Sequence, residues 1–189
     1  MNFEEDIQRS LRILRSGGII LYPTDTIWGI GCDATNERAV EKIFSLKQRP
    51  ANKSMIVLLA GERDLFTYVS ALDIHVFEYL ETIQKPTTVI YEGAVGLAPN
   101  LINEDGSIGI RIVRDAFCKH LIKRSGIPLV STSANIAGNP PARFFAEIDM
   151  VIVNAVDYCV QYRQEDKTIH QPSSIVKWNT DKPITIIRH

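Results

Sequence analysis

The chain has 189 residues, the size of one ordinary domain, and can bury a hydrophobic core without disulfides or a structural metal. A hydrophobic fraction of 45% and a charged fraction of 23% are typical of a soluble globular protein and exclude a disordered one. No apolar run approaches the roughly 18 residues of a membrane span, and the acidic N-terminus does not resemble a signal peptide. We therefore expect one domain over residues 1–189, located in the cytoplasm and without a membrane contact.

The net charge of −1 argues against a protein whose main task is to coat nucleic acid, because such proteins need an excess of Lys and Arg. This charge is still compatible with a small basic pocket. The cysteines and histidines are scattered and form no C-x-x-C pair or other metal-ligand spacing. We therefore expect reduced, inert thiols and no metal site built from protein side chains.

Helical and strand patterns alternate in the first half of the chain. Apolar residues recur at helical spacing from Phe3 to Leu14, and a second amphipathic helix follows the capping residue Asn36 and ends before Pro50. Further helices are predicted near 62–69 and 73–84, and buried strands at 19–22, 55–60 and 87–91.

The second half of the chain contains mostly predicted strands and loops. Residues 93–106 carry several Gly, Pro and Asn and predict a long loop. One helix is predicted near 116–124, and strands at 107–113, 128–131, 150–154, 174–178 and 184–188. This mixture predicts a single α/β domain with helices flanking a mixed sheet, and it leaves the strand order open.

Common nucleotide-binding and hydrolase motifs are absent. No G-x-x-x-x-G-K-[ST] phosphate loop and no G-x-S-x-G elbow occurs. Residues 29–34 match G-x-G-x-x-A, but no acid lies about 20 residues further on, where a Rossmann site would need one. We therefore disfavour a dinucleotide-binding domain.

Three cations lie close together at Lys47, Arg49 and Lys53. They could stabilise a helix C-terminus, or they could clamp phosphate groups, with Arg as a planar fork and Lys as a point charge. Lys47 lies four residues after Ile43, at the edge of the buried helix face, which favours the phosphate clamp.

Residues 131–135, Ser-Thr-Ser-Ala-Asn, follow the end of a strand, where open α/β sheets tend to bind ligands. Their hydroxyl and amide groups could bind a polar ligand or could form an ordinary polar turn. Taken with the cations at 47–49, they predict an enzyme that grips a nucleoside triphosphate between these two segments.

The strand at 107–113 has a polar face. Ser107, Gly109 and Arg111 point to one side, roughly 13 Å from first to last at about 3.3 Å per residue, and isoleucines point to the other. The glycine would leave room for a ligand against the backbone. Arg111 needs an anionic partner if it is buried, and that partner is either a protein carboxylate or a substrate carboxylate.

Six segments align in order with the motifs of one family. Residues 23–31, PTDTIWGIG, resemble its P-T-[DE]-T-x-[YW]-G-x-G signature, KQRP at 47–50 resembles its K-x-R-P motif, and PLVSTSAN at 128–135 resembles its hallmark ending in S-x-N. Less distinctive segments align at 107–112, 172–176 and 187–188. The chain thus resembles the YrdC/TsaC-type threonylcarbamoyl-AMP synthases over essentially its whole length.

The resemblance implies a twisted α/β fold with a concave, positively charged central cavity. It also implies that L-threonine, bicarbonate and ATP are joined to give threonylcarbamoyl-AMP and pyrophosphate, with Mg²⁺ accompanying the ATP. A separate transferase complex would then pass the threonylcarbamoyl group to tRNA. Cations and hydroxyls without a dedicated nucleophile suit this chemistry, which depends on positioning and on stabilisation of negative charge.

Individual roles also follow from the resemblance. The residues that it assigns to threonine are Thr26, Arg111, Ser133 and Ser173. Those that it assigns to ATP are Arg49, Lys53, Ser107, Asn135, Arg143 and Arg188. Lys47 and Arg49 would be the catalytic residues beside the phosphates, and Asp25 could assist a metal or the threonine amine.

One departure and one alternative bear on this interpretation. Leu58 stands where archaeal-like members carry a His that contacts threonine, so that contact would be absent or replaced. The alternative is a paralogue of the same fold that binds tRNA or double-stranded RNA without synthase activity. Such paralogues typically lack K-x-R and S-x-N, and both motifs are intact here, which favours the synthase.

Overall fold

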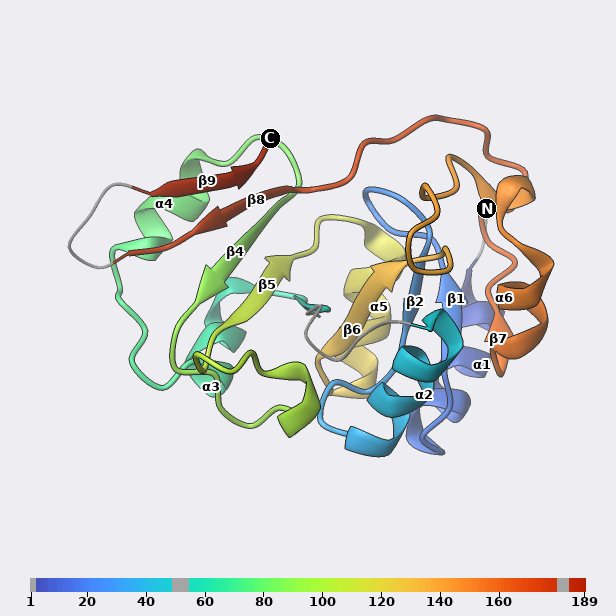
Figure 1. Ribbon diagram of the computed structural model, residues 1–189, viewed down its shortest axis with the longest axis horizontal. Helices are drawn as coiled ribbons and strands as arrows, with labels where there is room; N and C mark the ends of the chain where they lie inside the picture. The colour runs from blue at the N-terminus through green and yellow to red at the C-terminus, as the bar shows by residue number, and fades with distance from the viewer. Residues whose placement is uncertain (1–2, 49–54, 180–183) are drawn as a thin grey trace.

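The computed structural model describes residues 3–48, 55–179 and 184–189, and within them a nine-stranded mixed sheet forms the centre of the molecule (Figure 1). The strand order is β7-β1-β2-β6-β3-β5-β4-β8-β9. Three neighbouring pairs are parallel, β1 with β7, β3 with β5 and β4 with β8, and the other pairs are antiparallel. The strands are β1 (Ile20–Tyr22), β2 (Gly29–Gly31), β3 (Ile56–Leu59), β4 (Thr87–Tyr91), β5 (Ile108–Ile112), β6 (Leu129–Ser133), β7 (Tyr158–Cys159), β8 (Ser174–Lys177) and β9 (Thr185–Arg188).

Six α-helices flank this sheet in the described part of the chain, which confirms the predicted α/β class. They are α1 (Glu4–Arg15), α2 (Glu37–Lys47), α3 (Leu65–Tyr68), α4 (Val76–Thr82), α5 (Ala116–Ser125) and α6 (Met150–Ala155). Short 3-10 segments lie at η1 (Glu62–Asp64), η2 (Pro99–Leu101) and η3 (Phe145–Glu147).

Helices α2 and α5 each begin at a side-chain cap and end at a residue with left-handed backbone. The Asn36 side chain accepts a hydrogen bond from the Ala39 amide at 3.1 Å and starts α2, which ends where Gln48 adopts a left-handed φ of 49°. The Asp115 carboxylate caps α5 through the Cys118 amide at 2.9 Å, and Gly126 ends it at a φ of 71°.

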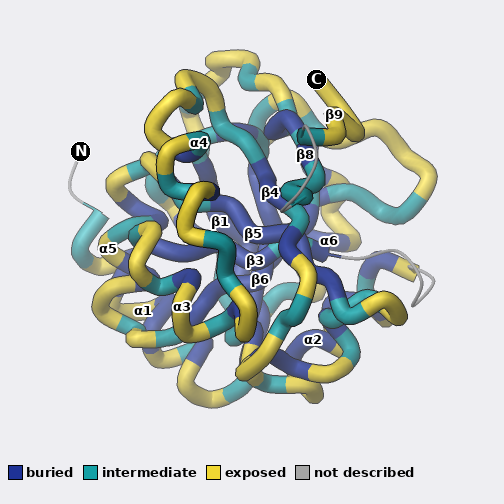
Figure 2. The backbone as a smooth tube through the Cα atoms, turned by 90° about the vertical axis from the view of Figure 1, so that its left-hand side faces the viewer, coloured by how far each residue is buried: buried dark blue, intermediate teal, exposed yellow. Residues whose placement is uncertain are grey.

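The sheet has a buried core on each side, and its central strands are buried (Figure 2). On one side, α1 and α5 pack through residues such as Ile7, Leu14 and Phe117, and we call this the α1/α5 core. On the other side, α2 packs through Val40 and Ile43, together with parts of α3, α4 and α6. Helix α1 follows the 3.6-residue period of its apolar positions, as the sequence predicts.

The α1/α5 core covers only part of its side of the sheet. Leu58 on β3 and Leu129 on β6 are paired and buried in this core. One step further along the same pair of strands, on the same face, Ile56 and Ser131 are paired and instead line a cavity. The cavity therefore begins where the helical cover stops.

The predicted strand at 150–154 is wrong, because these residues form helix α6. The run Met-Val-Ile-Val has high β-propensity. However, the Asp149 side chain accepts a hydrogen bond from the Val151 amide at 2.9 Å and starts a helix that buries only Ile152. The capping residue, rather than the propensity of the apolar run, decides the local structure.

Residues 93–106 contain no long regular element, but they are packed against the body of the protein. Leu97, Ala98 and Leu101 are buried, and the Ala98 amide donates to the Ala34 carbonyl at 2.9 Å. Strand β2, which the sequence analysis did not predict, lies beside β6 and brings Gly29 into the cavity wall.

A buried carboxylate on α1 organises the segment that follows β7. Asp6 is 7% exposed and accepts hydrogen bonds from the Tyr158 hydroxyl at 2.5 Å and from the amides of Gln161 and Tyr162 at 2.9 Å each. This one side chain satisfies donors that would otherwise be buried and unpaired.

We expect Asp6→Ala to lower the free energy of unfolding by about 3 kcal/mol, because it leaves several buried donors without an acceptor. Urea denaturation followed by circular dichroism would measure this change. Glu5→Ala is the matched control, since Glu5 lies next to Asp6 but is exposed, and its loss should cost less than about 0.5 kcal/mol. Equal effects of the two changes would contradict the role given to Asp6.

Candidate functional site

A cavity of about 280 Å³ lies over the ends of β2, β3, β5, β6 and β8, on the part of the α1/α5 side of the sheet that these two helices leave uncovered. Its wall includes hydroxyl groups, apolar side chains and two arginines. All four residues assigned to threonine by the resemblance lie in this wall, together with one residue assigned to ATP. These five are Thr26, Arg111, Ser133, Ser173 and Arg188.

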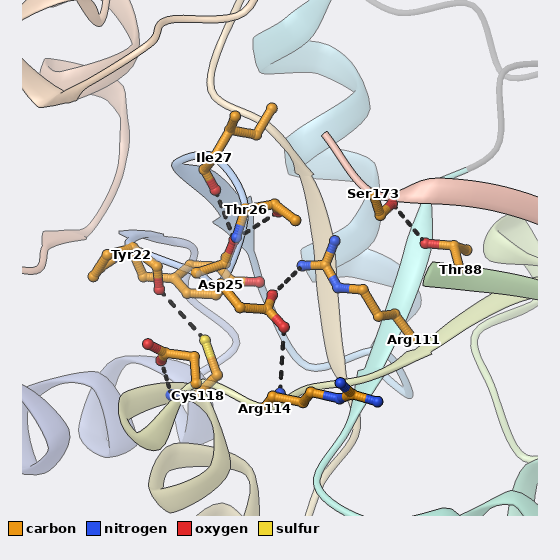
Figure 3. A network of polar contacts seen from close by, with 12 residues as sticks. Tyr22, Asp25, Thr26, Ile27, Thr88, Arg111, Arg114, Cys118 and Ser173 are labelled. Atoms are coloured by element: carbon orange, nitrogen blue, oxygen red, sulfur yellow. Dashed lines mark hydrogen bonds and ion pairs between the residues drawn. The ribbon is translucent and has the colours of Figure 1, made fainter. Parts of the chain in front are cut away.

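Arg111 is the buried cation of this wall (Figure 3). It projects from β5 with 3% of its side chain exposed, and its Nη2 lies 3.2 Å from Asp25 Oδ1. The contact is an ion pair without the alignment of a hydrogen bond. Separately, Arg111 Nε is buried and has no hydrogen-bond partner among the described residues. The protein therefore supplies a counter-charge for Arg111 and leaves part of its donor fork without a protein partner.

Asp25 is held on both of its oxygens. Besides the contact of Oδ1 with Arg111, its Oδ2 accepts a hydrogen bond from the backbone amide of Arg114 at 3.3 Å. The Arg114 side chain donates to the carbonyls of Ile83 and Gln84 and thus does not contact Asp25. Asp25 consequently stands behind Arg111 as a support for the guanidinium.

The hydroxyl of Thr24 fixes the loop that carries Thr26. It accepts from the Thr26 amide at 3.0 Å and donates to the Ile27 carbonyl at 2.8 Å. Since a hydroxyl has one proton to donate, the 2.9 Å contact between the two threonine hydroxyls must use the proton of Thr26. Thr26 Oγ1 therefore presents only acceptor capacity to the cavity.

The opposite part of the wall comes from the end of the chain. Ser173 Oγ lies 2.9 Å from Thr88 Oγ1, and both hydroxyls are buried. Arg188, the last residue of β9, donates from Nε and Nη2 to the Ser173 carbonyl at 3.1 and 2.8 Å. Ser173 is thus fixed through both its side chain and its backbone.

Lys47 is brought to residues 133–135, as the sequence analysis expects, but it does not line the cavity. Its side chain is buried, and its Nζ donates to the carbonyls of Ser133 and Asn135 at 2.5 Å each. The Ala137 amide also donates to the Lys47 carbonyl at 3.0 Å. Lys47 therefore ties the end of α2 to the end of β6, and its role beside phosphates stays a prediction.

The structure does not gather the other residues assigned to ATP. Ser107 is outside the cavity wall, because its hydroxyl donates to Asp105 at 2.6 Å and accepts from Asn103 at 3.0 Å. Arg143 is held by Glu147, with Nε 3.0 Å from Oε1.

The remaining ATP assignments follow different patterns. The Asn135 amide group donates to the Asn139 carbonyl at 2.7 Å, whereas its Oδ1 is buried without a partner among the described residues. Arg49 and Lys53 lie outside the described residues.

Two expectations about the strands are changed by the structure. The space above Gly109 is not free, because a Cβ there would lie 3.2 Å from Thr88 Cγ2 and 3.3 Å from Ile56 Cγ2. Side chains of the neighbouring strands fill the room that we expected a ligand to use. Leu58 is buried in the α1/α5 core and is not part of the cavity wall, so it does not replace the family histidine as a contact.

The part of the chain that the structure describes has neither a membrane-spanning helix nor a group of metal-binding side chains. Its helices are too short or too polar to cross a membrane. Within residues 3–48, 55–179 and 184–189, no three His, Cys, Asp or Glu side chains are grouped to hold a metal ion.

A mixed α/β sheet with a half-covered face, and a cavity walled by hydroxyls and one buried arginine, suit a small polar ligand that carries an anionic group. Residues 12–189 match the family of Sua5, YciO and YrdC proteins, described as telomere recombination. The chain is also 37% identical over 157 residues to the threonylcarbamoyl-AMP synthase of Stenotrophomonas maltophilia, covering 82% of this chain and 84% of that one. The protein therefore belongs to the Sua5/YciO/YrdC family.

Solved structures share the fold. E. coli YciO superimposes with a TM-score of 0.83 at 22% identity, over 98% of this chain and 89% of its own. P. abyssi Sua5, solved in complex with L-threonine, superimposes with a TM-score of 0.86 at 20% identity over 98% of this chain. The present chain spans about half of that Sua5 chain, since it covers 54% of it.

The tie made by Lys47 generates a prediction about stability. Lys47→Met keeps the length of the side chain but leaves two buried carbonyls without their donor, so we expect the free energy of unfolding to fall by about 3 kcal/mol. Urea denaturation would measure it.

Lys42→Met is the matched control on the same helix. The Lys42 ammonium donates to the Gly17 carbonyl at 2.8 Å at an exposed position, so its loss should cost less than about 0.5 kcal/mol. A Lys47→Met protein as stable as the Lys42→Met protein would show that the tie carries no stability.

Proposed function

We propose that the protein is a threonylcarbamoyl-AMP synthase of the cytoplasm. The observation that carries this proposal is the convergence of Thr26, Arg111, Ser133 and Ser173 on one cavity. Relatives that are 33% to 38% identical are threonylcarbamoyl-AMP synthases, which supports the same function. The product would be consumed by a separate transferase complex that modifies tRNA.

The reaction has two steps that balance without an oxidant or reductant. The threonine amine and bicarbonate combine to form a carbamate with loss of water. A carbamate oxygen then attacks the α-phosphorus of ATP, and the bond to the β-phosphate oxygen breaks, so that threonylcarbamoyl-AMP forms and pyrophosphate leaves. Both steps bring anions together and therefore depend on positioned cations and donors.

Arg111 and Thr26 suit the two charged ends of an amino acid. Arg111 lies in the cavity wall and the protein does not use all of its donors, so its guanidinium would bind the threonine carboxylate. Thr26 Oγ1, which has only acceptor capacity left, would accept from the amine. The hydroxyls of Ser133 and Ser173 would complete the threonine subsite between β6 and β8.

ATP would lie toward residues 133–135 and Arg188. The buried Oδ1 of Asn135 lacks a partner among the described residues and could accept from the nucleotide. Ser107 and Arg143 would contribute only after leaving Asp105 and Glu147, and the resemblance assigns Arg49 and Lys53 to the same nucleotide as further cations. With Arg111 and Arg188, these cations would make the cavity positively charged.

Mg²⁺ would arrive with the ATP phosphates rather than occupy a protein site. Asp25 is the acid that supports Arg111, and its two oxygens face that guanidinium and the Arg114 amide. This arrangement does not fit a metal ligand. It fits a residue that holds Arg111, and no step of the reaction needs a metal bound to Asp25.

The first test is the substrate requirement. We expect the pure protein to release pyrophosphate from ATP only when L-threonine and bicarbonate are both present, because the carbamate is the attacking group. A coupled phosphate assay with each substrate omitted in turn would measure this. Pyrophosphate release that ignores threonine would overturn the proposal. Tight, steeply salt-dependent RNA binding without turnover would favour the RNA-binding alternative.

Arg111→Lys tests the carboxylate contact. A lysine keeps the charge opposite Asp25 but loses the planar fork, so we expect kcat/KM for threonine to fall by about 100-fold, roughly the loss of one charge-assisted hydrogen bond. Steady-state kinetics with threonine as the varied substrate would show it. Arg114→Lys is the control, since the Arg114 side chain contacts only carbonyls outside the cavity. Similar losses in both variants would remove Arg111 from the threonine subsite.

A further inference from the structure

The loop that carries Thr26 is held from its outer side as well as from within. The Pro23 carbonyl accepts from Cys118 Sγ at 3.4 Å, and the Thr24 carbonyl accepts from Arg163 Nη1 at 3.2 Å. The bonds of Thr24 Oγ1 fix the internal shape of the loop. These outer bonds instead fix where the whole loop lies relative to its neighbours.

Arg163 is an unusual residue for a connecting segment. Its backbone has a left-handed φ of 67°, which costs free energy for any residue other than glycine. Its side chain is only 20% exposed. Such a conformation persists where the surroundings determine it.

The guanidinium of Arg163 joins three segments of the chain. Besides the Thr24 carbonyl, its Nη1 lies 3.1 Å from Asp115 Oδ2, and its Nε lies 3.3 Å from Asp166 Oδ2. The other oxygen of Asp115 caps α5, and the other oxygen of Asp166 accepts from the Thr168 amide at 2.9 Å. Each carboxylate is thus fixed independently of Arg163.

These connections act on one side of the threonine subsite. The bond to the Thr24 carbonyl ties Arg163 to the loop that carries Thr26, and the pair with Asp115 ties it to the start of α5. Arg163 itself lines a small recess beside the cavity, which shares Thr26 with it, and does not line the cavity. It is therefore placed to act on the subsite through other residues.

We propose that Arg163 is a positioning residue for the amino-acid subsite, which holds the loop of Thr26 in place against the start of α5. The inference rests on the proposed function. Its chemical requirement is a fork, because one guanidinium bonds a carbonyl and two carboxylates that lie in different directions. A lysine ammonium at the same position would keep the charge but could not serve all three acceptors.

The test is Arg163→Lys, with L-threonine and L-serine compared as substrates. We expect the KM for threonine to rise roughly tenfold, with kcat at saturating threonine and the KM for ATP within about twofold, as for a loss of substrate binding alone. The preference for threonine over serine should also fall, because a wider subsite discriminates less well by one methyl group.

Arg124→Lys is the matched control. Arg124 also makes an ion pair from the α5 region, to Glu4 at 2.6 Å, but it faces α1 rather than the loop of Thr26. We expect its kinetic constants and its preference for threonine to equal those of the unmodified protein. Asp166→Asn serves as a second variant, with a smaller rise in the KM for threonine in the same direction.

Several outcomes would overturn the inference. One is a KM for threonine that stays unchanged in Arg163→Lys, and another is a loss of kcat alone with the same preference for threonine, which would indicate a general structural defect. If Arg163→Lys does not fold, an unchanged KM in Asp166→Asn would overturn it. Absence of threonine-dependent turnover in the unmodified protein would instead refute the proposed function, and this inference with it.

Discussion

The buried charge of Arg111 is the constraint on which the arrangement of the site depends. A guanidinium in the middle of a β-sheet must find a counter-charge, since an unpaired buried cation is strongly unfavourable. Asp25 provides this charge from the loop after β1 and is itself fixed by the Arg114 amide. The ion pair consequently holds the loop after β1 beside Arg111 of β5. Thr26 reaches the cavity because its neighbour in the sequence is bound to Arg111.

A second buried cation places the other side of the cavity. Lys47 Nζ donates hydrogen bonds to the Ser133 and Asn135 carbonyls, so the end of β6 is held at the end of α2. Ion pairs and charged hydrogen bonds of this kind add little net stability compared with apolar packing, although the removal of one partner is costly. Their value here is geometric, because both cations fix loops that have few apolar side chains to pack.

The sequence predicts most of the fold because the hydrophobic periods are clear. It fails at 150–154, where propensity favours a strand and the Asp149 cap imposes a helix. It also misses β2, since glycines disfavour strands in general. In this fold, a Cβ on Gly31 would lie only 2.3 Å from the Val130 carbonyl oxygen, so close packing between strands requires the glycine.

The same limits apply to the site. The motifs identify the residues of the proposed threonine subsite, and the fold brings those residues into one cavity wall. They do not reveal that Asp25 supports Arg111, because that contact depends on a strand order that the sequence leaves open. The local partners of Ser107 and Arg143 lie two and four residues away, at Asp105 and Glu147. Those two contacts could have been anticipated from spacing alone.

The direction of the hydrogen bonds around Thr24 gives the cavity a chemical polarity. Because Thr24 donates to the Ile27 carbonyl, the Thr26 hydroxyl must donate inward and can only accept from a ligand. With a guanidinium on one side and an acceptor on the other, an amino acid has one favourable orientation for its two charged groups. Two such contacts fix the direction of the line that joins the two charged groups, and a third contact, to the side chain, is what would distinguish the two hands of the α-carbon.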